Sequence, residues 1–308
     1  MHGHGTQDGS DDKDIPKIVL VGNPNVGKSV IFGLLTGKYV TVSNYPGTTV
    51  EISQAYSGFN REKSLVIDTP GTNSLIPQSE DERVTRDILL KEQPEVVVQV
   101  MDSKNIRRAL SLTLQLAEMD MPFILDLNMV DEARSRGIYI DEKKLSRTFG
   151  VEVVSTVATR RQGFGALTDS ISAPRKSPVT VAYATEIETG IRNLMDLDQT
   201  ADTISRSVAI MFLAGDDGIE EWLDDRVDAT VMKQARSIRD RLQYGNPKPL
   251  GHIINQQRMT RVDEILEDVL RVDALKKGRD IYQNIGRWTM HPVWGIPILL
   301  AVLYLTYK

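Results

Sequence analysis

The residues from Gly22 to Ser29 have types and a spacing that suit the binding of phosphate groups. They fit the pattern G-x-x-x-x-G-K-S, which reads in order Gly22, Asn23, Pro24, Asn25, Val26, Gly27, Lys28 and Ser29. In such a loop, backbone N–H groups and the N-terminus of the next helix surround the phosphates. Lys28 is expected to reach the β- and γ-phosphates, and Ser29 to bind a magnesium ion. The segment predicts a nucleotide site that extends into Val30 on the following helix.

Two shorter motifs farther along the chain narrow the nucleotide to one with a guanine base. Asp68 and Gly71 form a D-x-x-G motif, in which the carboxylate binds magnesium through water and the Gly71 N–H meets the γ-phosphate. Asn128, Met129 and Asp131 belong to an N-x-x-D motif. Its carboxylate can accept hydrogen bonds from N1 and N2 of guanine, and adenine lacks this pair of donors. The three motifs together predict a GTPase that uses Mg²⁺.

Apolar runs directly before these motifs predict the strands that position them. Runs suited to buried strands occupy residues 17–22, 64–67, 95–101, 122–127 and 151–155. The clearest helical segment between them is 106–119. Alternating strands and helices imply a mostly parallel sheet covered on both faces, with the nucleotide site at the carboxyl ends of its strands. The predicted fold class is therefore α/β, a P-loop GTPase followed by a small all-helical domain.

The organisation of the chain follows from shifts in composition. Two prolines and two basic residues at 174–178 mark a linker, after which apolar residues recur at helical spacing up to about residue 272. The acidic pairs at 216–217 and 224–225 are expected to be exposed charges at helix caps and on helix surfaces. We expect five segments: a disordered leader at 1–16, a GTPase domain at 17–174, a helical spacer or regulatory domain at 175–272, a juxtamembrane segment at 273–292 and a truncated transmembrane helix at 293–308.

The last segment is an uncharged run of residues 293–307, somewhat shorter than the roughly 20 residues that span a bilayer. It is interpreted as the start of a transmembrane helix, and a buried C-terminal helix is the alternative. Basic residues precede it, which by the positive-inside rule assigns the N-terminal region to the cytoplasm; they are Lys276, Lys277, Arg279 and Arg287.

Charge and composition exclude some classes of partner. The net charge is −5, from 42 acidic and 37 basic residues, so a general surface for nucleic acid is not expected. The chain has no cysteine, which excludes disulfides and thiolate metal sites and agrees with a reducing compartment.

The motifs are those of the Ras-like translation-factor GTPase class. Longer stretches of the sequence around them resemble FeoB-type ferrous iron transporters. The distinctive stretches are NYPGTTVE, DTPGTNSL, MDSKNIRRALSLTLQLAEMDMP, LNMVDEARSRGIYIDEKKLSRTFGV and HPVWGIP. This resemblance implies a GTPase domain and a helical spacer on the cytoplasmic face of the inner (cell) membrane, coupled to an iron-conducting pore. A small cytoplasmic regulator and a second copy of the chain are further partners to consider.

The resemblance also assigns individual residues. Thr49 matches the first-switch threonine that binds magnesium and the γ-phosphate, while Thr48, next to Gly47, is the second choice. Asn25 matches the asparagine that binds a potassium ion in potassium-stimulated members; the alternative is a loop asparagine that holds its own turn. The last guanine-site motif falls at Val157 and Ala158, where the family usually has Ser-Ala. The resemblance implies that the Ala158 backbone N–H meets guanine O6, while the support that the serine hydroxyl gives to the loop is lost. We therefore expect weaker base affinity and faster nucleotide release.

The residue after Gly71 is Thr72, so the glutamine that orients the attacking water in Ras is missing. Intrinsic hydrolysis is therefore expected to be slow, on the order of 10⁻⁴ to 10⁻² per second. Such a rate suits a timer or gate for the pore. Two other classes remain open at this point: a soluble GTPase of ribosome or tRNA maturation, and a nucleotide-dependent membrane scaffold without a pore.

Overall fold

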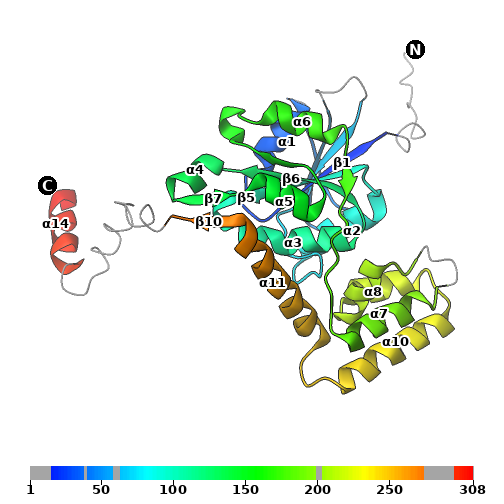
Figure 1. The fold of residues 1–308 in the computed structure, drawn as a ribbon. Coiled ribbons are helices and arrows are strands. Elements are labelled where there is room, and N and C mark those ends of the chain that lie inside the picture. Colours follow the sequence, from blue (N-terminus) through cyan, green and yellow to red (C-terminus); the bar gives the residue numbers. More distant parts are fainter. Residues whose placement is uncertain (1–14, 38–39, 58–62, 199–202, 274–294, 308) are drawn as a thin grey trace, which may run out of the picture.

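The structure, a computed structural model, describes residues 15–37, 40–57, 63–198, 203–273 and 295–307. Within these ranges a sheet covered by helices forms one domain, and a group of helices lies beside it (Figure 1). The expected leader lies outside the described residues up to residue 14, and so do residues 274–294, which include almost all of the expected juxtamembrane segment.

The main sheet has eight strands, seven of them in the order β2-β3-β4-β1-β5-β6-β8, with β9 pairing to β6. The run from β4 to β8 is parallel, while β2, β3 and β9 pair antiparallel. The mostly parallel α/β fold predicted from the sequence is confirmed. The strand bounds are β1 Lys17–Val21, β2 Thr41–Asn44, β3 Glu51–Tyr56, β4 Leu65–Asp68, β5 Val96–Asp102, β6 Pro122–Asn128, β8 Val153–Ser155 and β9 Arg175–Lys176.

Helices cover both faces of this sheet because its central strands are apolar without alternation. On one face α1 and α6 pack over a core that includes Leu20, Val98 and Ile124. On the other, α2, α3 and α5 pack over a core that includes Val19, Val97 and Leu125. The helices of this domain are α1 Lys28–Thr36, α2 Glu80–Glu92, α3 Ile106–Glu118, α4 Val130–Ser135, α5 Glu142–Phe149 and α6 Phe164–Ile171.

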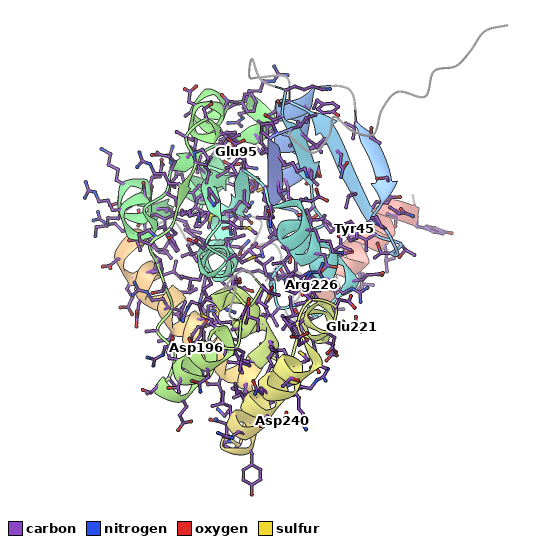
Figure 2. The ribbon with its side chains drawn as sticks, turned by 90° about the vertical axis from the view of Figure 1, so that its right-hand side faces the viewer. Tyr45, Glu95, Asp196, Glu221, Arg226 and Asp240 are labelled. Carbon is purple, nitrogen blue, oxygen red and sulfur yellow. The ribbon has the colours of Figure 1, made fainter. Side chains whose placement is uncertain are left out.

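The helical domain shares its hydrophobic core with the second of these sheet faces. Helix α3 is buried along ten of its residues and packs on β5, α8 and α11, so apolar side chains continue from the sheet into the helices. Figure 2 shows the sheet above and the helices below, with Asp196 and Asp240 marking the helical domain. Its helices are α7 Thr185–Met195, α8 Arg206–Leu213, α9 Asp217–Asp224, α10 Ala229–Tyr244 and α11 Leu250–Val269.

The end of α11 returns to the sheet domain as a strand. Residues Leu270–Val272 form β10, which pairs antiparallel with β7, Ile138–Ile140. The helical periodicity extends to about residue 272, so the last three residues differ from the expected helix. Without β10, the backbone N–H and C=O groups along this edge of β7 would be unpaired, and β10 supplies their hydrogen-bond partners. The Asp141 N–H also donates to the Val269 carbonyl at 2.8 Å.

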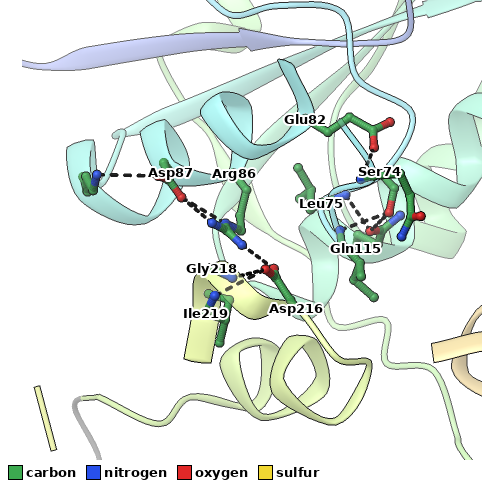
Figure 3. A network of polar contacts seen from close by, with 12 residues as sticks. Ser74, Leu75, Glu82, Arg86, Asp87, Gln115, Asp216, Gly218 and Ile219 are labelled. Atoms are coloured by element: carbon green, nitrogen blue, oxygen red, sulfur yellow. Dashed lines mark hydrogen bonds and ion pairs between the residues drawn. The ribbon is translucent and has the colours of Figure 1, made fainter. Parts of the chain in front are cut away.

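Buried ion pairs join the two domains. Arg86 on α2 forms an ion pair with Asp216, the N-cap of α9, and both side chains are almost fully buried (Figure 3). Glu118 on α3 accepts a hydrogen bond from Arg258 on α11 at 2.7 Å. The expectation of an exposed charge at Asp216 is therefore wrong, because Asp216 caps its helix at a position that faces Arg86 rather than water.

The last described helix is α14, Gly295–Tyr307, which lies within the run expected to begin a transmembrane segment. Across the described part of the chain, no helix combines the length and the apolar character needed to cross a bilayer.

Candidate nucleotide-binding site

The predicted motifs meet at one edge of the sheet, because each follows the carboxyl end of a parallel strand. The phosphate loop follows β1, the D-x-x-G motif begins at the end of β4, and the N-x-x-D motif begins at the end of β6. The Val157–Ala158 pair follows β8. Crevices beyond the carboxyl ends of strands are where open α/β sheets bind their ligands.

Two glycines let the phosphate loop run close to its neighbours. Gly27 has φ +90°, and a Cβ there would lie 2.4 Å from the Nδ2 atom of Asn128. A Cβ on Gly22 would lie 2.3 Å from the carbonyl oxygen of Val100. Both approaches exclude a larger side chain, so the loop passes over β5 and touches the guanine motif, and Gly27 directs the chain into α1.

Asn25 stands in the left-handed region with φ 63°, and its side chain is exposed. Asparagine tolerates this backbone better than most residues, which agrees with a turn role. The exposed side chain is also accessible to a cation beside the loop.

Lys28, Ser29 and Asp68 come together at the mouth of the loop. The Lys28 ammonium donates to the Asp68 carboxylate and to the Thr69 carbonyl, and Ser29 Oγ lies 3.0 Å from Asp68 Oδ2. Lys28 and Asp68 are both more than nine-tenths buried. A hydroxyl beside a carboxylate is the hard oxygen donor set that Mg²⁺ prefers, so these residues fit the expected ion.

The D-x-x-G segment packs against the phosphate loop. The Thr72 N–H donates to the Gly22 carbonyl at 2.9 Å, and Asn23 Nδ2 donates to the Thr72 carbonyl at 3.2 Å. A Cβ on Gly71 would lie 2.9 Å from the Cα of Pro24. The Thr72 hydroxyl is fully buried and donates to the Ser74 carbonyl at 2.8 Å, so it does not take the place of the missing glutamine.

The two threonines of the first switch differ in their surroundings. Thr48 Oγ1 donates to the Tyr45 carbonyl at 2.9 Å and accepts from the Val50 N–H at 3.2 Å, so it holds the turn. Thr49 is exposed, and no other described residue hydrogen-bonds to its side chain. Gly47 has φ +77°, and a Cβ added there would meet no other atom within 4 Å. The structure thus leaves Thr49, rather than Thr48, able to reach a ligand.

Asn128 connects the guanine motif to the phosphate loop. Its Nδ2 donates to the Val26 carbonyl at 2.9 Å, and its Oδ1 accepts from the Ala158 N–H at 3.0 Å. Met129 turns the chain with φ 60° into α4, which brings Asp131 to the first turn of that helix. The Ala158 N–H, which we expected to meet guanine O6, here donates to Asn128 instead.

Asp131 and Val157 lie at the outer part of the predicted base site. The Asp131 carboxylate is partly exposed and lies 3.4 Å from an exposed guanidinium nitrogen of Arg160. Val157 is buried and exchanges backbone hydrogen bonds with Gln162, at 3.1 Å and 3.3 Å. This backbone bridge supports the loop at the position where the serine hydroxyl is absent.

Sequence reasoning missed Asp126 and Thr156, which lie beneath Asn128. Thr156 Oγ1 is 2.6 Å from Asp126 Oδ1 and 3.2 Å from Asn128 Oδ1. Asp126 is fully buried, and its Oδ2 atom has no hydrogen-bond partner. Burial, opposed in part by the hydrogen bond from Thr156, raises the pKa of Asp126 to about 7. The signal in the sequence was a charged residue inside the otherwise apolar run PFILDL.

Comparisons with known proteins identify relatives for both domains. The family model described as ferrous iron transport protein B matches residues 16–171, and that of the FeoB cytosolic helical domain matches residues 183–271. The chain is 29% identical to an Fe(2+) transporter FeoB of Staphylococcus aureus over 94% of this chain and 44% of the relative. It is 35% identical to that of Methanocaldococcus jannaschii over 83% of this chain and 39% of the relative.

Solved structures agree with these relatives. A GDP-bound crystal structure of an S. thermophilus NFeoB mutant has a TM-score of 0.74 and 27% identity, covering 83% of this chain and all of that chain. The cytosolic domain of L. pneumophila FeoB has a TM-score of 0.73 and 26% identity, covering 83% of this chain and 99% of that chain. The chain spans about two fifths of the length of the two curated relatives named above.

Proposed function

Because the chain belongs to the family of ferrous iron transport protein B, we propose that it hydrolyses GTP slowly and that its nucleotide state gates ferrous iron passage through an attached membrane pore. The chain carries the family's GTP-binding GTPase domain and its helical domain. The observation that carries the proposal is the meeting of the phosphate loop, Asp68 and Asn128 at one sheet edge.

Each group has a role that follows from its position. On nucleotide binding, the Lys28 ammonium would leave Asp68 and the Thr69 carbonyl and donate to phosphate oxygens instead. Hydrogen bonds between an ammonium group and phosphate oxygens are charge-assisted and strong. Ser29 and Asp68, with Thr49 after the first switch closes, would hold Mg²⁺. When bound, this ion neutralises charge on the β- and γ-phosphates. The Gly71 N–H would then meet the γ-phosphate.

We expect slow turnover because the residue after Gly71 provides no side chain that could orient the attacking water. The Thr72 hydroxyl is committed to the Ser74 carbonyl, so hydrolysis relies on backbone groups, an ordered water or an added cation. Asn25, exposed at the loop, is our candidate ligand for a potassium ion that supplies positive charge beside the phosphates. A slow site that changes state rarely suits a gate better than a continuously driven pump.

A path from the nucleotide to the helical domain supports the gating role. Asn23 of the phosphate loop donates to Asn73 Oδ1 at 3.0 Å, and the Asn73 N–H donates to Glu82 on α2 at 3.0 Å. One turn later on α2, Arg86 reaches Asp216 of the helical domain (Figure 3). A movement of the D-x-x-G segment on γ-phosphate loss would therefore act on α2 and, through one buried ion pair, on α9.

We further propose that the chain works on the cytoplasmic face of the inner membrane, beside its own pore domain. A small cytoplasmic regulator and homo-oligomers are the other partners we consider, and nucleic acid is not among them. The iron would be the cargo of the pore rather than a ligand of this domain.

The first test is nucleotide binding by the purified chain. We expect GTP and GDP to bind far more tightly than ATP, and Lys28→Ala to weaken GTP binding by roughly tenfold or more. Lys143→Ala, an exposed change on α5, is the matched control and should bind like the parent. Equal affinities for GTP and ATP would refute the guanine assignment.

The proposed gating role is tested with the full-length protein in liposomes. Ferrous iron uptake should differ between GTP and GDP, and Lys28→Ala should abolish that difference. Uptake that is the same with either nucleotide, in protein that binds both, would refute gating while leaving the GTPase assignment intact.

A further inference from the structure

A single hydroxyl lies between two acceptors beneath the guanine motif. Thr156 Oγ1 is 2.6 Å from Asp126 Oδ1 and 3.2 Å from Asn128 Oδ1. A threonine hydroxyl has one proton to donate, so it can satisfy only one of the two oxygens at a time. With an ionised Asp126, the shorter contact and the negative charge direct that proton to Asp126.

The other oxygen, Asn128 Oδ1, then depends on the Ala158 N–H, which donates to it at 3.0 Å. The same N–H is the group that we expect to meet guanine O6. A protonated Asp126 reverses the arrangement, because its own O–H can donate to Thr156 Oγ1 and the Thr156 proton can turn to Asn128. Asn128 is then satisfied without Ala158, whose N–H becomes available to the base.

The surroundings of Asp126 make both protonation states accessible. Its neighbours across the sheet are Val100 on β5 and Val154 on β8, and its Oδ2 atom is buried without a partner. An isolated buried carboxylate is costly, which favours the protonated form. The resulting pKa of Asp126, about 7, lies in the physiological range.

Charged groups on the surrounding elements are engaged elsewhere or exposed, and none of the described residues forms an ion pair with Asp126. Lys28 on α1 contacts Asp68, and Arg160 after β8 lies beside Asp131. The remaining groups on the neighbouring elements are Asp102 at the end of β5, Arg175 and Lys176 on β9, and the exposed Asp169 on α6.

We propose that Asp126 is a positioning residue for guanine recognition: when protonated it leaves the Thr156 hydroxyl to Asn128 and frees the Ala158 N–H for the base, and when ionised it withdraws that support. This inference rests on the proposed function, because it concerns the same guanine site. It makes the affinity for GDP fall as the pH rises through neutrality.

The test is the dissociation constant of a fluorescent GDP analogue between about pH 5.5 and 8.5, for the parent and for Asp126→Asn. The asparagine can donate to Thr156 at every pH, so the variant should keep the tight, low-pH affinity throughout. The parent should weaken relative to the variant by roughly three- to tenfold across the range, as expected for one hydrogen bond. Titration of the GDP phosphate affects both proteins equally and cancels in the ratio.

Two further measurements separate positioning from a general effect on folding. Binding of inorganic pyrophosphate, which has no base, should show no difference in pH dependence between parent and variant. Thr156→Val should bind GDP more weakly and lose the Asp126-dependent pH response. In carboxyl ¹³C NMR, one signal should titrate near neutrality in the parent and be missing in Asp126→Asn.

A constant ratio of GDP affinities across this pH range would overturn the inference, and so would an Asp126 signal that titrates with ordinary aspartates. In both cases the parent would still bind GDP, so the proposed function would stand. A parent that binds no GDP at any pH would overturn the proposed function together with this inference.

Discussion

The buried ion pair between Arg86 and Asp216 predicts a measurable coupling between the two domains. The two side chains are 2% and 3% exposed, so removal of either partner leaves the other charge in a poorly solvated place. Breaking such a pair costs about 3–5 kcal/mol in stability. Each ion has secondary partners here: Arg86 lies 2.7 Å from Asp87, and Asp216 Oδ1 accepts from the Gly218 and Ile219 N–H groups. We therefore expect a somewhat smaller loss than this range, about 2–3 kcal/mol for each single change.

The variants are Arg86→Met, Asp216→Asn and the double change. Asparagine is also a good N-cap, so Asp216→Asn removes the charge but keeps the cap of α9, whereas Asp216→Ala should lose about 1 kcal/mol more. The double variant leaves no unpaired charge, and we expect it to be about as stable as either single variant, with a coupling energy of about 2 kcal/mol.

Urea denaturation followed by circular dichroism and by tryptophan fluorescence, to which Trp222 on α9 contributes, measures these differences. Arg83→Met is a matched control, because Arg83 is exposed on the same helix. Simple additivity of the two single changes, within about 0.5 kcal/mol, would show that the pair does not couple the domains.

Four further predictions concern the nucleotide site. Thr49→Ala should slow GTP hydrolysis by roughly tenfold, about 1.4 kcal/mol in barrier, with little change in GDP affinity; normal hydrolysis would exclude Thr49 as the switch residue. Asp131→Asn should lower GTP affinity on the order of 100-fold and favour xanthine nucleotides, and unchanged base preference in competition binding would count against Asp131. Hydrolysis should be faster in potassium than in sodium at equal ionic strength, and Asn25→Gly, which keeps the left-handed backbone, should remove the difference; identical parent rates in the two salts would leave Asn25 as a turn residue. The raised pKa of Asp126, about 7 against an ordinary 3.8, means that stability is lost as the pH rises between these values, by about 4 kcal/mol in total. Thermal melts should therefore show Asp126→Asn to be more stable than the parent at pH 8 and similar at pH 4, and equal melting temperatures at both pH values would contradict the buried, shifted carboxyl.

The sequence alone was enough for the fold class and for the family to which the chain belongs. A glycine-rich loop between a strand and a helix that carries Lys28 and Ser29 is typical of phosphate binding. A mostly apolar run without alternation, such as that before Asn128, indicates a strand in a sheet covered on both faces. These features are local: the chemistry of a short segment and its own hydrophobic period determine them. For the same reason the helix at 106–119 was predicted to within one residue.

Short strands were harder to predict, because the availability of a pairing partner, rather than the composition of the segment, determines whether such a strand forms. The β2–β3 hairpin has an exposed outer strand with no apolar alternation, and β10 is a strand only because the edge of β7 is available to it.

Only the tertiary structure decided the environments of the charged residues. The sequence predicts that Asp216 is an exposed helix cap. It is buried because the N-terminus of α9 packs against Arg86 on α2, which is 130 residues away in the chain. Thr48 and Thr49 are indistinguishable by type, and the turn hydrogen bonds occupy the first while leaving the second exposed. Asp126 gains its raised pKa from neighbours on two other strands and from the lack of a partner for Oδ2. Burial and pairing depend on segments far apart in the chain, whereas the predicted nucleotide-binding motifs are each complete within a few residues.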